Sequence, residues 1–178
     1  MTILLAALLC APASATGSQS SSSQSDEQIR QRIDTYLGSI DAPIRPAQWR
    51  ALGPRGAAVL EQIAQDSRVL PTRRAKALDG LSALGTPTAP DTMLHLARSE
   101  ETPLVVRLSA VRAVSRVLPA DQVAPALEPV LQGAQDGHVR AVAAEMLSSH
   151  GGCTLVRAQA AREDNPTRLR RALQRCGR

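Results

Sequence analysis

The stretch VRLSAVRAV, residues 106–114, is followed thirty-three residues later by the related stretch VRAVAAEML, residues 139–147. Arg74, Arg107 and Arg140 are separated by 33 residues each, with no gap between the copies. Three residues after each arginine stands an alanine, seven after it an aliphatic residue and eight after it a serine: Ala77, Ala110 and Ala143; Leu81, Val114 and Leu147; Ser82, Ser115 and Ser148. Several aligned columns at one period of this length predict an internal structural repeat.

Each copy of the repeat divides into two helical segments. The first helices are predicted over residues 57–65, 89–99 and 120–133, and the second over 72–85, 103–118 and 138–151. The residues at the ends of the second helices support these bounds, since Pro71, Pro103 and Gly137 stand at or just before their starts and Gly85, Pro119 and Gly151 end them. Pro125 and Pro129 predict that the helix over 120–133 is kinked or starts late.

Helical geometry gives each column of the repeat a direction. At about 100° per residue, positions three, seven and ten after the arginine share one face and are expected to form the buried stripe: Ala77, Leu81, Leu84; Ala110, Val114, Val117; Ala143, Leu147, His150. The arginine lies on the flank of this stripe. Its methylene groups can cover apolar surface there, while the guanidinium reaches a neighbouring carbonyl or carboxylate. Positions one, five and eight are expected to face outward.

Helix pairs of this length, with Val-Arg, then alanine, then leucine, resemble HEAT repeats. The segment DGHVRAVAAEML, residues 136–147, carries the resemblance most fully through Asp136, Val139, Arg140, Ala143 and Leu147. The resemblance covers residues 46–151 well and 152–178 loosely. It implies an all-α, armadillo-type fold, a right-handed α-solenoid of about four helical hairpins, in a family dominated by scaffolding and partner binding. Solenoids need caps at their ends, and residues 25–40, with Ser25 as N-cap, are predicted to form an N-terminal capping helix.

The first residues predict export. An apolar run over residues 3–11 is followed by Ala13-Ser14-Ala15, the pattern of a secretory signal peptide over residues 1–15 with cleavage after Ala15. The run is too short to span a membrane. Leu9 precedes Cys10, whereas lipidation signals have a small residue there, which argues against a lipid anchor. Residues 16–25 are polar and low in complexity, and are expected to be a flexible linker to a folded domain over 26–178.

Export leaves two cysteines in the mature chain, Cys153 and Cys176. One helix is predicted to start at Cys153 and a second to run from Pro166 to Cys176, so an antiparallel hairpin would bring the two thiols together. The prediction is a structural disulfide in a C-terminal cap over 152–178, in the periplasm or outside the cell. Two free thiols packed as small apolar groups are the alternative.

Composition restricts the function. Aromatic residues make up 1% of the chain, so the core must be aliphatic, and a pocket lined by aromatic side chains for a pigment or a base is disfavoured. The net charge is +5, and nearly every basic residue is an arginine, which with the richness in alanine is typical of a GC-rich bacterial genome. His95, His138 and His150 have no metal-binding spacing. We therefore expect no catalytic residue, no cofactor and no metal.

What remains is the outward column of alternating charge. Asp79, Arg112 and Glu145 occupy position five of successive repeats, and Leu108 lies one turn before Arg112. These four are the candidate residues for binding an unknown protein or peptide. A solvated face in which Arg112 bridges the two carboxylates is the alternative for the charged column. The alternating sign argues against nucleic acid. Two other functions stay open: an accessory or lyase-type protein acting with an enzyme or pigment, and a basic anion-binding module.

Overall fold

The computed structural model describes residues 25–39 and 43–177, and the only regular elements in those ranges are helices. The predicted signal peptide, Cys10, and the predicted linker up to residue 24 lie outside the described residues. The expectation of an all-α fold is confirmed. In the part of the chain that the structure describes, no helix is long and apolar enough to cross a membrane.

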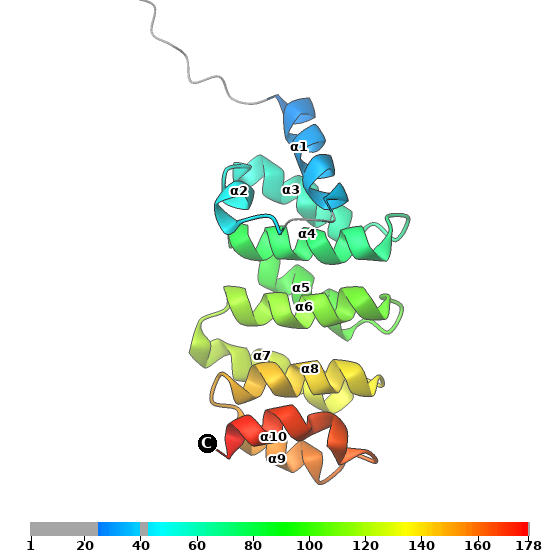
Figure 1. Ribbon diagram of the computed structural model, residues 1–178, viewed down its shortest axis with the longest axis vertical. Helices are drawn as coiled ribbons and strands as arrows, with labels where there is room; N and C mark the ends of the chain where they lie inside the picture. Colours follow the sequence, from blue (N-terminus) through cyan, green and yellow to red (C-terminus); the bar gives the residue numbers. More distant parts are fainter. Residues whose placement is uncertain (1–24, 40–42, 178) are drawn as a thin grey trace, which may run out of the picture.

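Three helix pairs form the middle of the molecule. The pairs are α3 (Gly53–Gln65) with α4 (Pro71–Leu84), α5 (Ala89–Arg98) with α6 (Leu104–Val117), and α7 (Ala120–Gly133) with α8 (Gly137–Ser148). Figure 1 shows α4, α6 and α8 lying one below another, with α5 and α7 behind them, and the same neighbours pack together in the contact pattern. Equivalent positions of successive repeats therefore lie on neighbouring helices.

In the three pairs, the helix bounds depart from the predicted ones by more than one residue at two places. α3 begins at Gly53, four residues before the predicted start, because Gly53 adopts a positive φ of 63° and Pro54 then fits the first turn. α8 ends at Ser148, before the predicted end, and the Gly152 amide donates to the Leu147 carbonyl at 2.8 Å. A kink or a late start was predicted for this helix, and the late start is wrong, since α7 begins at Ala120 and continues through Pro125 and Pro129. Both prolines are exposed, so water can solvate the carbonyls that they leave without a donor.

The N-terminal end is built from α1 (Asp26–Gly38) and α2 (Pro46–Arg50). The predicted N-cap is confirmed, because the Ser25 hydroxyl accepts from the Gln28 amide and the Gln28 side chain accepts from the Ser25 amide. The short helix α2 was not predicted. Its buried Trp49 packs edge-on against Tyr36 of α1 with ring centroids 5.2 Å apart, so the chain's two aromatic residues close the core at this end.

The C-terminal end is a shorter hairpin. α9 (Cys153–Ala160) is followed by a 3₁₀ turn, η1 (Pro166–Leu169), and by α10 (Arg170–Cys176), where one continuous helix from Pro166 was predicted. α10 packs against α8 and α9, and so continues the row of second helices. The Asn165 side chain accepts from the Thr167 amide and so caps the 3₁₀ turn.

The predicted stripe lies in the core. Positions three and seven are fully buried in all three second helices, and position ten is half-buried in each. The buried arc is wider than predicted, because position four is also fully buried, in Leu78, Val111 and Ala144. The second helices contact both their own partners and the neighbouring second helices, which covers more of each helix than one partner would.

Candidate functional site

The repeated arginines hold each helix pair closed. Arg74 and Arg107 are buried, and the Nε of each donates to the carbonyl of an alanine near the end of the first helix, Ala64 at 2.9 Å and Ala97 at 3.4 Å. In the third pair, Arg140 Nη1 donates to the Ala134 carbonyl at 2.7 Å. Cations at a helix C-terminus are stabilised by its unpaired carbonyls and by the helix dipole. The predicted reach of the guanidinium toward carbonyls is therefore confirmed, and its role is structural.

Two of these arginines also bind carboxylates. Arg107 donates to Glu100 at 2.6 Å, and Arg140 donates to Glu163, in the loop of the last hairpin, at 2.8 Å. The Arg107 hydrogen bond lowers the pKa of Glu100, and the Arg140 hydrogen bond lowers the pKa of Glu163. Glu100 also accepts from the Gln135 amide at 3.1 Å. These contacts tie the loop of one pair to the loop of the next.

We use the name second-helix face for the surface that contains Asp79, Leu108, Arg112 and Glu145. The structure places these residues on three neighbouring helices, α4, α6 and α8. Asp79 and Arg112 are exposed, whereas Leu108 and Glu145 are half-buried. Leu104 and Val105, at the start of α6, are 39% and 41% exposed and lie on the same side of the helix as Leu108. The face thus combines separated charges with a small apolar area.

The proposed bridge by Arg112 is wrong. Asp79 is paired with Arg116, whose Nη2 lies 2.6 Å from Asp79 Oδ1. Arg116 is one turn further along α6 than Arg112, and this shifts its guanidinium toward α4. Among the described residues, neither the Arg112 guanidinium nor the Glu145 carboxylate has an ion-pair or hydrogen-bond partner. Both groups are therefore available to a binding partner.

The serine column has a role that the sequence did not reveal. Each serine hydroxyl donates to the carbonyl three residues before it: Ser82 to Asp79 at 2.8 Å, Ser115 to Arg112 at 2.9 Å and Ser148 to Glu145 at 2.8 Å. Ser115 is buried, contrary to the expected outward position, because it packs beside Met146 of the next second helix. These bonds satisfy the hydroxyl donors within their own helices.

A pocket of about 450 Å³ adjoins the second-helix face at its N-terminal end. Its walls come from α2, α4 and α6, and include Trp49, Lys76, Asp79 and Arg116. The pocket was not predicted from the sequence, because α2, which supplies one of its walls, was not predicted. The signal was present in PAQWR, residues 46–50, where a proline at the first helical position precedes four residues that are compatible with a helix.

The three histidines lie apart. His95 is exposed on α5 and His138 on α8, and His150 Nδ1 lies 2.7 Å from the Met146 carbonyl at the end of α8. Residues 25–39 and 43–177 contain no group of three or more His, Cys, Asp or Glu side chains that could hold a metal ion.

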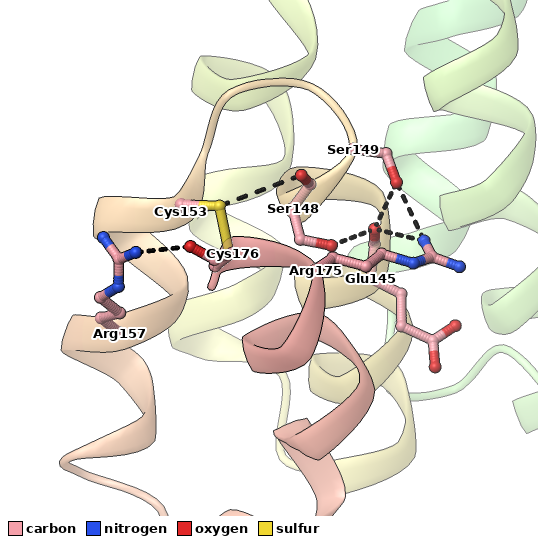
Figure 2. The surroundings of a disulfide bond; sticks show 7 residues. All are labelled: Glu145, Ser148, Ser149, Cys153, Arg157, Arg175 and Cys176. Atoms are coloured by element: carbon pink, nitrogen blue, oxygen red, sulfur yellow. Dashed lines mark hydrogen bonds between the residues drawn. A yellow bond between two sulfur atoms is a disulfide. The ribbon is translucent and has the colours of Figure 1, made fainter. Parts of the chain in front are cut away.

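The C-terminal hairpin is closed by a disulfide between Cys153 and Cys176, with Cα atoms 5.4 Å apart (Figure 2). Cys153 Sγ lies 3.9 Å from the Ser148 carbonyl, a packing contact because a disulfide sulfur carries no proton. Arg157 donates to the Cys176 carbonyl at 2.7 Å, and Arg175 donates to the Ser149 hydroxyl at 2.9 Å. The last hairpin is thus fastened both to itself and to α8. A disulfide is compatible with an oxidising compartment.

Comparison of the chain with family models, with curated proteins and with solved structures found no match. The structure is compatible with a helical repeat, and membership of the HEAT family stays a prediction.

Proposed function

We propose that the protein is a non-catalytic, exported scaffold, a right-handed HEAT-like α-solenoid that binds a protein or peptide partner through the second-helix face. The observation that carries the proposal is that the charged side chains of Arg112 and Glu145 are left unpaired by the fold of the described residues. They occupy the same repeat position on neighbouring helices, they carry opposite charge, and neither side chain has an internal partner in the described part of the chain. Charged groups that the fold does not use can give a partner register and orientation.

The surroundings of the two charges support this proposal. Leu104, Val105 and Leu108 supply apolar area close to Arg112, and arginine beside apolar side chains is a common composition of the energetically dominant parts of interfaces. The helices beneath have fully buried alanines at position three, which allow close packing and a firm support for the face. Rigid support lowers the entropic cost of binding.

Export is supported by two independent features. The apolar run and the Ala13-Ser14-Ala15 pattern are typical of a cleaved signal peptide. The disulfide between Cys153 and Cys176 is of the kind that persists outside the reducing cytoplasm.

The test is affinity capture with tagged protein from the periplasm and medium of its native cells, with identification of the captured protein by mass spectrometry. Binding of the purified partner is then measured for Arg112→Glu and Glu145→Arg. We expect each reversal to weaken binding at least tenfold, which corresponds to about 1.4 kcal/mol. Arg30→Glu, which makes the same charge change as Arg112→Glu on an exposed residue of α1, is the control.

The proposal is overturned if both reversals on the second-helix face bind the partner as tightly as the unaltered protein while their folding is intact. Turnover of a substrate, or a chromophore that stays with the purified protein, would instead support the accessory or lyase-type function.

A further inference from the structure

The net positive charge of the protein comes from its C-terminal end. Residues 137–178 contain eight arginines and three acidic residues, whereas residues 1–136 contain 13 basic and 13 acidic residues. The whole formal net charge of +5 therefore belongs to α8 and the last hairpin. Figure 1 shows this hairpin at the opposite end of the molecule from α1. The molecule is electrically asymmetric along its long axis.

The arginines of this hairpin face solvent without carboxylate partners. Six of them are exposed: Arg157, Arg162, Arg168, Arg170, Arg171 and Arg175. We call these six the C-terminal arginine patch. Within the described ranges none of the six forms an ion pair, and the one ion pair in this part of the chain joins Arg140 to Glu163. By contrast, Arg55, Arg73 and Arg116 in the first part of the molecule each pair with an aspartate.

The patch is held in place by its own scaffold. The disulfide closes the hairpin, Arg157 binds the Cys176 carbonyl, and Arg175 reaches across to Ser149 of α8 (Figure 2). The Arg168 guanidinium lies against Gly137, where a Cβ atom would come within 2.4 Å of Arg168 Nη1. Arg162, Arg170 and Arg171 have no such fixed contact and keep their side chains free for an external anion. Preorganised charges lose less entropy on binding.

The surroundings of the patch indicate what kind of anion it fits. The four principal pockets are lined only by residues before 117, and the large exposed apolar side chains, Leu70, Leu104 and Val105, all lie outside the last hairpin. A folded acidic partner would need a groove or an apolar anchor for tight binding. Single-stranded nucleic acid would need aromatic side chains for stacking, and Tyr36 and Trp49 lie at the other end of the molecule. A lipid surface needs no groove, apolar anchor or aromatic side chain on the protein. Its phosphate headgroups are numerous and mobile, so they can move to meet the exposed arginines.

From this charge distribution we propose that the C-terminal arginine patch docks the protein on membranes that contain anionic phospholipids. The phosphate groups of the lipid headgroups are the ligands, and the guanidinium groups bind them through charge-assisted hydrogen bonds. The inference does not depend on the second-helix face, which lies on α4, α6 and α8 and stays open to a protein partner. Because arginine stays charged across the physiological range, binding depends strongly on salt and little on pH.

The test is cosedimentation of the intact, oxidised protein with vesicles of phosphatidylcholine containing 30% phosphatidylglycerol (roughly a third anionic lipid, a common model surface), against vesicles of phosphatidylcholine alone. We expect binding to the anionic vesicles only, and a loss of binding as salt is raised. The triple variant Arg162→Gln/Arg170→Gln/Arg171→Gln should bind about 100-fold more weakly, because each arginine near an anionic surface contributes roughly a factor of five.

The matched control is Arg30→Gln/Arg45→Gln/Arg50→Gln, which removes the same charge from exposed residues at the other end. It should bind within a few-fold of the unaltered protein. Circular dichroism and the thermal midpoint show whether each variant is folded. Absence of binding by the unaltered protein, or equal weakening in both triple variants, overturns the proposal. A 12-residue polyglutamate peptide and a 20-nucleotide DNA strand are assayed in parallel, and preferential binding of either one over the vesicles also overturns it.

Discussion

At the scale of single residues, the repeated positions have a structural task that helical periodicity only partly reveals. Arg140 is the fullest example, because it contacts two carbonyls at the end of α7 and the Glu163 carboxylate of the next hairpin. The Glu163 side chain is 2% exposed, and that of Arg140 is 17% exposed. A nearly buried carboxylate of this kind is retained only where it is paired.

The first prediction concerns this pair. Glu163→Gln should lower the free energy of unfolding by about 1–3 kcal/mol at pH 7, because the charge-assisted hydrogen bond from Arg140 is lost. Asp164→Asn, an equal change at the exposed neighbour, should have little effect. Urea denaturation followed by circular dichroism measures both. Equal stability of the two variants would contradict a structural role for the pair.

The same pair predicts a dependence on pH. The pKa of Glu163 is lowered in the folded protein from its ordinary value of 4.5, mainly by the Arg140 hydrogen bond. The stabilisation is therefore complete above about pH 4.5 and is lost as the pH falls through the lowered folded-state pKa. We expect the difference in thermal midpoint between the unaltered protein and Glu163→Gln to shrink between pH 5 and the strongly acid range. A difference that stays constant with pH would show that the carboxylate charge does not contribute.

At the scale of elements, the close packing of neighbouring helices decides which residue fits at a given helix position. Gly80 stands in the middle of α4, where a glycine lowers helix propensity. A Cβ atom at this position would lie 2.8 Å from the Trp49 ring and 2.9 Å from Leu60. The glycine therefore allows α2 and α3 to pack tightly on α4, and this closes the N-terminal end of the core.

The second prediction reverses the usual effect of a glycine-to-alanine change in a helix. Gly80→Ala should destabilise the protein by about 1–3 kcal/mol through overpacking, although helix propensity alone predicts a gain of about 1 kcal/mol. Gly133→Ala is the matched control at the end of α7, since a Cβ there meets nothing within 4 Å. Thermal unfolding measured by circular dichroism distinguishes the two, and a stabilised Gly80→Ala would show that Trp49 does not pack there.

The last hairpin is the element that depends most on a covalent bond. α9 and α10 have 8 and 7 residues, which is too short for helices to be stable without support. The third prediction is that Cys153→Ser/Cys176→Ser destabilises the protein by about 2–4 kcal/mol, from the closure of a loop with a sequence separation of 23 residues. A reductant should destabilise the unaltered protein and leave the double variant unchanged. A reductant that affects neither would mean that the disulfide contributes no stability.

At the scale of the whole molecule, the described helices share one aliphatic core that runs from Ile29 in α1 to Ala172 in α10. Each pair packs on its neighbours, so the buried side chains of the described residues form one continuous core. Short arrays of this kind unfold as a unit because each pair is stabilised by the next.

The fourth prediction tests that cooperativity. Trp49 is the only tryptophan and reports on the N-terminal end, whereas circular dichroism reports on all helices. We expect both signals to give the same midpoint in guanidinium chloride. Ala110→Leu, in the fully buried column of α6, should lower both midpoints together by overpacking. A fluorescence transition that separates from the circular dichroism transition would show that the two ends unfold independently.

By itself the sequence determined the all-α class, the approximate bounds of the three helix pairs and the buried stripe, because these follow from local periodicity and from proline and glycine signals. It also indicated which cysteines would pair, since a helical hairpin places its two ends together. Only the tertiary structure decided that Arg116 rather than Arg112 pairs with Asp79, that Ser115 is buried, and that Trp49 occupies the space above Gly80. The physical reason is that side chains on neighbouring helices meet according to the lateral offset between those helices, and a one-dimensional period carries no information about that offset.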